Sequence, residues 1–383
     1  RSDAGAGVGG GGGGSGDEER LDAEVGGGKG GGGIRRDGEV KRNENGGRIV
    51  AELCQELTIF VPPPPKRVQV GSKHVDAFGL GTLPLGVLYP DASRRPDRAR
   101  AMAIIRTAAR LGAELFDTAD SYGADDKDFG YVEKLLHEAL RGGAEGRGGE
   151  EEQRGGRQER GGERREACVA TKGGMLRVSR EANGWRPSRC DREYLLTRMR
   201  SSWENLGGRD PVFLWQLHHP NEKESPIEEA MQAAKTAQER GWVRHVGLCN
   251  VTLDQLKRAR RVVEVAAVQC ELNYWTRKAE KQGILDYCRD NGIAFIAFGA
   301  LGGLKCRRGE RHLASSFPAL KYMADRKGFS CEATALASMR HLWPHLIHIP
   351  GARTEEHVQD IARGREVRFT AAELDELRRM KPR

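Results

Sequence analysis

Three features are missing from this chain of 383 residues: long apolar runs, paired cysteine motifs and a large excess of one charge. No run of about 18 apolar residues occurs, so no membrane-spanning helix is expected. The eight cysteines are scattered, without the Cys-x-x-Cys or paired histidine spacing of a zinc site, so we predict no metal and no disulfide framework. Such cysteine usage is typical of a reducing intracellular compartment, either the cytoplasm or an organelle such as a plastid.

The charges of the chain are nearly balanced. The 63 Lys and Arg residues against 55 Asp and Glu residues give a formal net charge of +8, which suits anionic small molecules as well as nucleic acid. The first residue is Arg1 rather than Met, so we expect the N-terminus to be incomplete and any targeting signal to be missing with it.

Two segments have the composition of low-complexity chain. Residues 1–66 contain glycine runs at 9–14 and 26–33 and few side chains to bury, so we predict a disordered N-terminal segment. Residues 141–166 contain four Arg-Gly-Gly triplets, a pattern that can bind RNA. This block also has seven Arg and seven Glu residues and no aromatic side chain to stack on bases. We therefore interpret it as a solvated insertion and expect no nucleic-acid partner.

The rest of the chain, 67–383, alternates between short apolar runs and amphipathic segments. The apolar runs have the length of strands and lie near 78–82, 114–117, 167–171, 212–217, 245–248, 265–269, 293–298 and 345–349. The amphipathic segments lie near 97–111, 130–141, 191–206, 226–240, 252–263, 279–291, 330–342 and 354–363. Alternating strands and helices form parallel sheets through right-handed crossovers. Eight such units in the 317 residues after residue 66 predict an α/β fold, a (β/α)8 TIM barrel.

An open, doubly wound sheet is the alternative α/β fold. It needs a glycine-rich fingerprint at the start of its first helix and an acidic residue about 20 residues later. Gly79 and Gly81 are followed by Thr82 and Leu83 rather than by a third glycine, so the sequence favours the barrel.

Three helix starts carry sequence signals. Ser225 precedes Pro226, which predicts an N-cap followed by proline at the first helical position. Capping boxes are predicted where Thr252 and Thr370 are each followed three residues later by Gln or Glu.

Polar side chains follow successive apolar runs at the point where each run ends. In a (β/α)8 barrel the carboxyl ends of the strands meet at one rim, where active sites lie. The residues at this rim are Asp117, with Tyr122 in the following loop, Lys172, His218, Asn250, Gln269 and Phe298. Taken alone, LFDTADSYG (115–123) is a polar turn, because Asp, Thr and Ser side chains bond to nearby backbone. Its partners on the neighbouring strand ends favour chemistry instead.

Tyrosine, lysine, aspartate and histidine at one rim can form a proton donor. A phenol with an ordinary pKa of about 10 donates poorly near neutrality. A neighbouring ammonium lowers that pKa, an aspartate holds the ammonium in place, and a histidine can fix a carbonyl oxygen beside the phenol. The nucleophile would then be a hydride carried by a bound cofactor.

These residues and their surroundings resemble the aldo-keto reductase family. The matching stretches are FGLGT (78–82), FDTADSYG (116–123), VATKGG (169–174), QLHHP (216–220), VRHVGLCN (243–250), VQCELNYW (268–275), IAFGALGG (296–303) and IPGARTEEHVQD (349–360). The resemblance covers about 67–383 except for the insertion. It implies a (β/α)8 barrel that binds NADPH in extended form without a Rossmann domain. It also implies reduction of an aldehyde or ketone to the alcohol.

The resemblance assigns roles to single residues. Tyr122 matches the general acid, and Asp117 and Lys172 match its tuning pair. His218, rather than His219, matches the residue that orients the carbonyl. The cofactor-binding positions of the family match Gly81, Thr82, Asn250, Gln269, Phe298, Leu301, Gly351, Arg353, His357 and Asp360. Asn250 and Gln269 would hold the nicotinamide carboxamide, Phe298 would stack on the nicotinamide, and the last four would grip the adenosine 2′-phosphate.

Three positions depart from the family pattern. Cys249 stands where a serine commonly precedes the asparagine, and Gly299 stands where a serine often follows the stacking aromatic. Gly351 replaces a lysine found in many members, which leaves Arg353 as the main cation. A guanidinium fork suits a phosphate, so we expect NADPH rather than NADH. A redox-sensing or regulatory nucleotide-binding subunit with little turnover is the alternative function, and the sequence names neither the carbonyl substrate nor an oligomeric state.

Overall fold

The computed structural model describes residues 60–87, 95–124, 126–145, 166–177, 185–186, 188–307 and 309–382, all within the unit Thr58–Arg383. Residues 1–59 of the segment predicted to be disordered, and residues 146–165 of the predicted insertion, lie outside the described residues. Residues 60–66, the end of the predicted low-complexity segment, are described, and the first two of them bond to the barrel unit. Val61 N donates to the carbonyl oxygen of Phe369 at 2.7 Å, and Phe60 forms an antiparallel bridge with Thr370.

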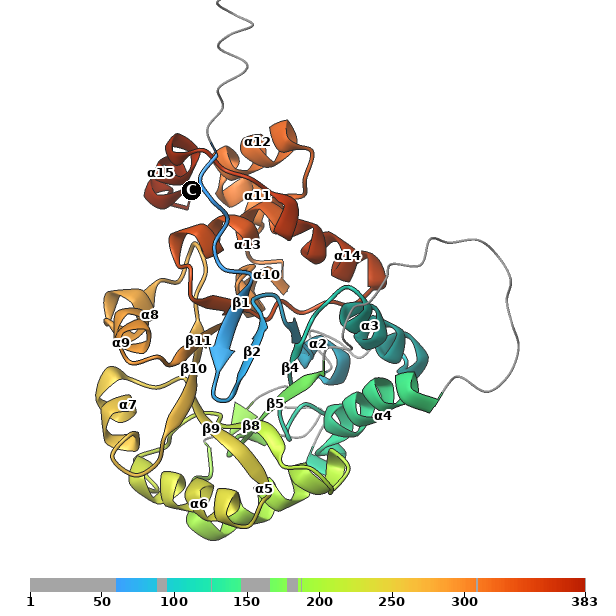
Figure 1. Ribbon diagram of the computed structural model, residues 1–383, viewed down its shortest axis with the longest axis vertical. Helices are drawn as coiled ribbons and strands as arrows, with labels where there is room; N and C mark the ends of the chain where they lie inside the picture. The colour runs from blue at the N-terminus through green and yellow to red at the C-terminus, as the bar shows by residue number, and fades with distance from the viewer. Residues whose placement is uncertain are drawn as a thin grey trace, which may run out of the picture. The chain divides into compact units, whose positions relative to one another are not determined.

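Eight parallel strands form the barrel (Figure 1). In sheet order they are β12 (Leu346–His348), β11 (Ala294–Phe298), β10 (Val265–Glu271), β9 (Val243–Cys249), β8 (Val212–Leu217), β5 (Cys168–Gly173), β4 (Leu115–Asp117) and β3 (Leu80–Gly81). Parallel bridges from Phe78 to His348 and from Gly81 to Gly351 join the two ends of this order. Each strand coincides with one of the predicted apolar runs, and the predicted (β/α)8 fold is confirmed.

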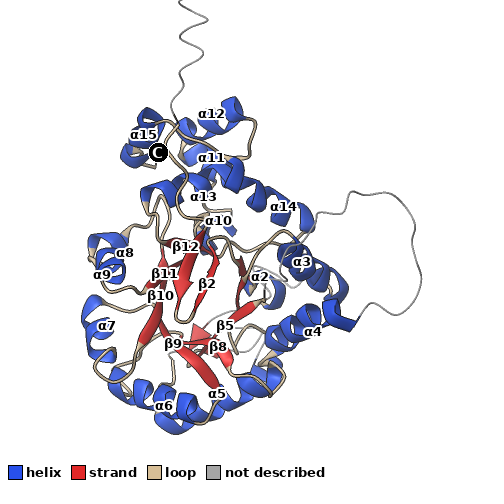
Figure 2. Cartoon of the chain, viewed as in Figure 1, coloured by secondary structure: helices blue, strands red, loops and turns tan. Residues whose placement is uncertain are grey.

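Helices cover the outside of the strands (Figure 2). Those that follow the predicted amphipathic segments are α3 (Arg98–Arg110), α4 (Tyr131–Glu145), α5 (Arg192–Asn205), α6 (Ile227–Glu239), α7 (Leu253–Ala259), α8 (Lys278–Lys281), α9 (Ile284–Asp290), α13 (Cys331–Leu342) and α14 (Glu355–Arg363). In α6 the buried residues recur at helical spacing and include Ile227, Ala230, Met231, Ala234 and Ala237. This apolar stripe is what packs the helix against the sheet.

Several element ends differ from their predictions. Helix α4 continues to Glu145, so the predicted insertion boundary at 141 falls inside a helix. Pro226 is the N-cap of α6 rather than its first helical residue, and the Ser225 hydroxyl donates to Glu229 at 2.7 Å. Both predicted capping boxes are present, at Thr252 for α7 and at Thr370 for α15 (Ala371–Arg379).

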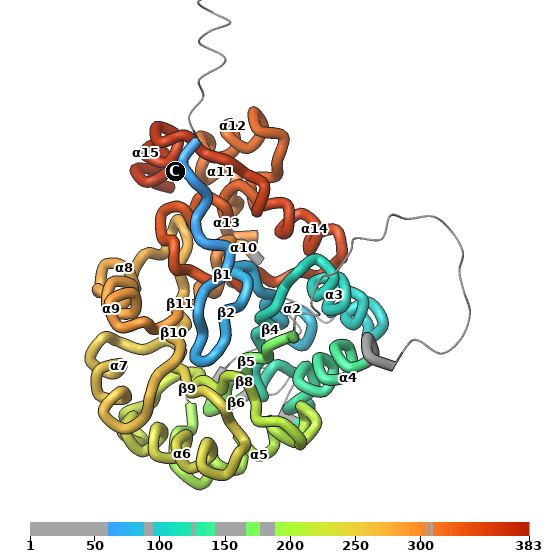
Figure 3. Tube along the Cα trace, viewed as in Figure 1, coloured from blue at the N-terminus to red at the C-terminus, as the bar shows by residue number. Residues whose placement is uncertain are grey.

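A β-hairpin that the sequence patterns did not predict lies at the amino ends of the barrel strands. It pairs β1 (Arg67–Val70) with β2 (Lys73–Asp76), and the tube in Figure 3 shows it in blue across the ring of strands. Val68, Val70 and Val75 pack against the inward-facing apolar side chains of the barrel, so the hairpin closes this end. Further unpredicted elements are α2 (Leu83–Gly86), η2 (Asp126–Asp128), β6 (Leu176–Arg177), β7 (Trp185–Arg186), α10 (Gly303–Arg307), α11 (Leu313–Ser316), α12 (Pro318–Lys327) and η4 (Gly364–Glu366).

Alternation along the strands separates two cores. In β8, Leu214 belongs to the apolar cluster inside the barrel, whereas Trp215 and Leu217 belong to the larger cluster between strands and helices. Gln216 points inward again, because side chains alternate along a strand. The barrel is therefore filled with apolar side chains at its amino end and carries polar side chains toward the carboxyl ends. Among the described residues, no helix combines the length and apolar character needed to cross a membrane.

Candidate active site

Asp117 and Lys172 form a buried ion pair at the mouth of the barrel. Lys172 Nζ donates to the two carboxylate oxygens of Asp117 at 2.7 and 2.8 Å, and to the carbonyl oxygen of Thr118 at 2.6 Å. These three bonds hold the ammonium at the barrel mouth. The two side chains are only 3 % and 2 % exposed, so the lysine is fixed in one orientation.

Tyr122 lies in the loop after β4, beside the partners predicted for it. Lys172 Nζ is 4.9 Å from the centre of the phenol ring, and the His218 ring meets the phenol edge-on with its centre 5.9 Å away. The loop reaches this position because Gly86 of α2 has no Cβ, which would collide with the carbonyl oxygen of Tyr122. His218 is buried while His219 is exposed, so His218 is the histidine in the barrel mouth.

Burial and neighbouring charge set the protonation of the lysine and the histidine. Burial alone would lower the pKa of Lys172, but the Asp117 carboxylate outweighs this and raises it, so the ammonium is maintained. Burial lowers the pKa of His218 well below its ordinary value, and the charge of Lys172 lowers it further. The imidazole is therefore neutral at pH 7, and it can donate one N–H to a carbonyl oxygen.

The pKa of Tyr122 is raised, whereas the sequence predicted that Lys172 would lower it. Burial raises this pKa to about 12, while Lys172 lowers it by its charge and by a hydrogen bond. Lys172 lowers the pKa, as predicted. Desolvation raises it by more than Lys172 lowers it, and the charges of Asp117 and Cys249 add smaller increases. The phenol thus keeps its proton across the physiological pH range and releases it only to a stronger base, such as a developing alkoxide.

Gln269 has the free acceptor that a carboxamide ligand requires. Its Nε2 donates to Asp117 Oδ1 at 2.8 Å, whereas its Oε1 is buried without a hydrogen-bond partner in the described part of the chain. Leaving a buried acceptor unpaired costs free energy, so a ligand N–H at this position is favoured. The amide of a nicotinamide provides such a donor, and the residue fits the predicted cofactor.

Asn250 is held at the adjoining strand end. It is the only non-glycine residue with positive φ among those described, at 58°. Its Nδ2 donates to the carbonyl oxygen of His218 at 3.1 Å and to Cys249 Sγ at 3.2 Å. A left-handed non-glycine residue is often found at a functional site, where surrounding contacts maintain the strain. These contacts orient the Asn250 amide and link it to the backbone of His218.

The turn after β11 carries the predicted stacking residue. Phe298 ends the strand, is half-buried and packs against the inner apolar cluster. Gly299 follows with φ of 63°, a conformation that serine adopts at a cost, which explains the glycine at this position. Leu301 follows in the same turn and is half-buried.

Two predicted cofactor residues, Gly81 and Thr82, lie at the end of β3. A Cβ at Gly81 would collide with the carbonyl oxygen of Ile349, so glycine allows the barrel to close toward Gly351. Thr82 is buried, and its hydroxyl donates to the carbonyl oxygen of Asp117 at 2.7 Å. Both residues therefore support the strand that presents Asp117.

The predicted phosphate-binding residues gather at the start of α14, with one exception. Arg353 precedes Thr354, the N-cap, whose side chain accepts from His357 N at 3.3 Å. Backbone N–H groups and the helix dipole favour an anion at this position. Asp360 instead accepts a hydrogen bond of 2.6 Å from Ser330, the N-cap of α13. The structure thus gives Asp360 a contact between two helices.

A buried charged cluster behind the Tyr122 loop was missed by sequence reasoning. Asp120 is fully buried and accepts from Arg198 Nε at 2.8 Å, while its backbone N–H donates to the carbonyl oxygen of Lys172 at 3.0 Å. Glu133, also buried, accepts from Thr171 at 2.6 Å. Asp120 lies in the stretch LFDTADSYG, but its partner is 78 residues away in sequence, so only the fold reveals the pair.

Replacing Arg198 with methionine is expected to destabilise the protein more at high pH than at low pH. Burial raises the pKa of Asp120 to about 7, and Arg198 opposes that rise, so the pKa will be higher still in the variant. Below pH 7 the carboxyl is mostly protonated in both proteins. Above pH 7 the wild type releases the Asp120 proton, whereas the folded variant retains it. The difference in unfolding free energy between wild type and variant therefore grows by up to about 1.4 kcal/mol per pH unit.

Urea unfolding at about pH 6 and about pH 8.5 measures this effect. Arg200→Met is the matched control, because Arg200 and its partner Glu204 are 64 % and 52 % exposed and their surface pair contributes little. An Arg198→Met penalty that does not change with pH would show that Asp120 does not titrate behind the loop.

Comparisons with known proteins identify the family to which this chain belongs. The sequence profile of the Aldo/keto reductase family matches residues 77–381. An uncharacterised oxidoreductase of Schizosaccharomyces pombe is 28% identical over 314 residues, 81% of this chain and 89% of the relative. The chain belongs to the aldo/keto reductase family and is an oxidoreductase, which confirms the resemblance noted in the sequence.

Solved structures show the same fold. Glycerol dehydrogenase from Gluconobacter oxydans aligns with a TM-score of 0.63 at 22% identity, covering 82% of this chain and 94% of the other. An aldo-keto reductase from Klebsiella pneumoniae in complex with NADPH aligns with a TM-score of 0.59 at 20% identity, covering 83% and 95%. Within the described part of the chain, no group of three or more His, Cys, Asp or Glu side chains could hold a metal ion.

Proposed function

We propose that residues 67–383 reduce an aldehyde or a ketone to the alcohol with NADPH, and that Tyr122 is the general acid. The observation that carries this proposal is the buried quartet at the barrel mouth. It combines a protonated phenol, a fixed ammonium and a neutral imidazole in one place. Membership of a family of oxidoreductases supports the reaction class, and the NADPH-bound Klebsiella structure supports the cofactor.

Each member of the quartet has a separate task in this proposal. NADPH, when bound, would supply a hydride to the carbonyl carbon, and negative charge would then develop on the carbonyl oxygen. The neutral imidazole of His218 donates to that oxygen and holds it beside the phenol. Tyr122 gives its hydroxyl proton to the oxygen, which completes the alcohol. Lys172, held by Asp117, stabilises the phenolate that remains.

Residues around the quartet would hold the cofactor. Gln269 Oε1 is a buried, unpaired acceptor and would take a carboxamide N–H, with Asn250 beside it. Phe298 would provide the aromatic face against the nicotinamide. Arg353 and the backbone at the start of α14 would bind the adenosine 2′-phosphate.

An initial-rate screen of NADPH consumption against aldehydes and ketones, run beside NADH, tests the proposed function. We expect steady-state turnover with at least one carbonyl class and a preference for NADPH. Tight NADPH binding without multiple turnovers on any carbonyl would instead indicate the alternative, a nucleotide-binding regulatory subunit. Consumption at equal rates with both nucleotides would contradict the role given to Arg353.

Replacing Arg353 with glutamine is expected to raise the KM for NADPH by about 10- to 100-fold, because a charge-assisted bond contributes about 1.5–3 kcal/mol. The KM for NADH should change little, since NADH lacks the 2′-phosphate. Arg363→Gln is the matched control, because Arg363 is an exposed arginine at the other end of α14. An equal rise in both KM values would show that Arg353 supports the fold rather than the phosphate.

A further inference from the structure

A hollow lined by basic side chains lies at the end of the barrel opposite Tyr122. It is bounded by residues 63–66, the end of β2, the C-terminal part of α13 and residues 364–368, with about 440 Å³ of empty space including the part open to solvent. Asp76 and Phe78 of its lining precede β3, which places it at the amino ends of the strands. We call this cavity the basic hollow. The charged residues that line it are Lys66, Arg340, Arg365, Arg368 and Asp76.

Arg340 is the unusual member of the basic hollow. It is 6 % exposed, although arginine is rarely buried unless it is paired. Its guanidinium donates to the carbonyl oxygen of Pro65, and its Nε has no hydrogen-bond partner in the described part of the chain. Burial, opposed by the charge of Asp76 and aided by that of Arg365, lowers the pKa of Arg340 to about 10, and the group stays charged at pH 7. The hollow therefore holds a buried cation with an unused donor.

The carboxylate of the basic hollow is already engaged. Asp76 pairs with Arg365 at 3.0 Å and also accepts from Phe78 N at 2.8 Å. Four cationic side chains and one carboxylate line the hollow, so the lining carries about three more positive than negative charges. Such an excess within one hollow favours an anionic ligand.

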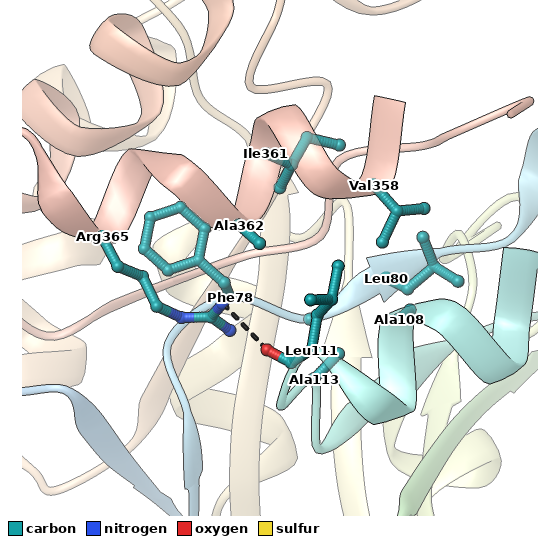
Figure 4. Close-up of a pocket in the computed structure, with 10 residues that line it drawn as sticks. Phe78, Leu80, Ala108, Leu111, Ala113, Val358, Ile361, Ala362 and Arg365 are labelled. Carbon is teal, nitrogen blue, oxygen red and sulfur yellow. Dashed lines mark hydrogen bonds between the residues drawn. The ribbon is translucent and has the colours of Figure 1, made fainter. Parts of the chain in front are cut away.

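The guanidinium groups are held in place before any ligand arrives. Arg340 and Arg365 lie 5.3 and 5.2 Å from the centre of the Phe78 ring. Figure 4 shows Arg365 alongside that ring, with its guanidinium donating to the carbonyl oxygen of Leu111 at 3.2 Å. Arg368 is fixed by bonds to the carbonyl oxygens of Arg365 and Val367 at 2.8 and 3.2 Å. Preorganised donors lose less entropy on binding.

We propose that the basic hollow binds a phosphate group, either free inorganic phosphate or the phosphate of a small monoester. Guanidinium forks match the oxygens of phosphate, and a dianion balances the surplus charge better than a single carboxylate does. The site is separate from the one proposed for the cofactor phosphate, because Arg353 follows the carboxyl end of β12 while Arg340 precedes the amino end.

Calorimetric titration of the full chain with inorganic phosphate, at constant ionic strength and with saturating NADPH, tests the site. NADPH is included so that the proposed 2′-phosphate site does not contribute. The test variant is Lys66→Gln with Arg368→Gln, because both side chains are exposed, whereas loss of the buried Arg340 would also disturb packing. The matched control is Lys235→Gln with Arg261→Gln, which removes two exposed cations far from the hollow in sequence.

We expect saturable phosphate binding that weakens by about tenfold or more in the test variant and is unchanged in the control variant. NADPH binding should be the same in all three proteins. Methyl phosphate in a second titration distinguishes the sources: competition identifies a monoester site, and its absence identifies a free-phosphate site. Phosphate affinity that is equal in the test and control variants, or no saturable binding to the wild type, would overturn the proposal.

Discussion

Tyr122→Phe is expected to lower kcat for carbonyl reduction by about 10²- to 10⁴-fold, the usual contribution of a general acid. The variant keeps the aromatic ring beside His218 and Lys172 and loses only the hydroxyl proton. NADPH affinity should therefore change by no more than about twofold. Single-turnover oxidation of bound NADPH by a carbonyl measures the chemical step, and a fluorescence titration measures the affinity.

Tyr274→Phe is the matched control for this prediction. Tyr274 is also a buried tyrosine, and its hydroxyl bonds to Ser338 at 2.7 Å, away from the quartet. Loss of the Tyr274 hydroxyl should lower the stability of the protein slightly and leave the single-turnover rate near that of the wild type. A Tyr122→Phe variant that turns over at the wild-type rate would contradict the proposed mechanism.

Lys172→Met is expected to cost about 3–5 kcal/mol of unfolding free energy as well as activity. The substitution leaves the Asp117 carboxylate buried with Gln269 as its remaining side-chain partner. An unpaired buried charge is far more costly than the pair itself is favourable. Urea unfolding measures the loss of stability at neutral pH.

A double substitution separates the ion pair from simple loss of packing. Asp117→Asn removes the charge that Lys172→Met leaves behind, so the double variant should be more stable than Lys172→Met alone. Activity should not recover with it, because the phenolate would still lack its ammonium. Strictly additive losses in the double variant would show that the two charges do not depend on each other.

The strand order and the membership of the rim could be predicted from the sequence. Strand ends such as that at Lys172 are marked by an apolar run followed by one polar residue, and barrel topology brings all of these ends to one rim. Local rules also predicted the capping boxes at Thr252 and Thr370, because cap signals depend on residues only three apart.

Properties that depend on packing between distant residues were not predictable in the same way. The pKa of Tyr122 is set mainly by burial, which the residue types at the rim do not specify. Asp360 matches a phosphate-binding position in sequence, but its side chain bonds to Ser330 of another helix. The hairpin β1–β2 closes the barrel with only four residues in each strand, too few for a clear periodic signal.

Deuterium transfer from NADPH labelled at nicotinamide C4 tests the proposed reaction directly. The carbonyl compounds of the screen are incubated with the wild-type protein and with Tyr122→Phe, and the deuterium content of the alcohols is measured by mass spectrometry. We predict that the wild type forms an alcohol with one deuterium on the former carbonyl carbon, and that Tyr122→Phe forms almost none in the same time. Unlabelled alcohol from the wild type, or labelled alcohol formed equally fast by both proteins, would contradict hydride transfer completed by the proton of Tyr122.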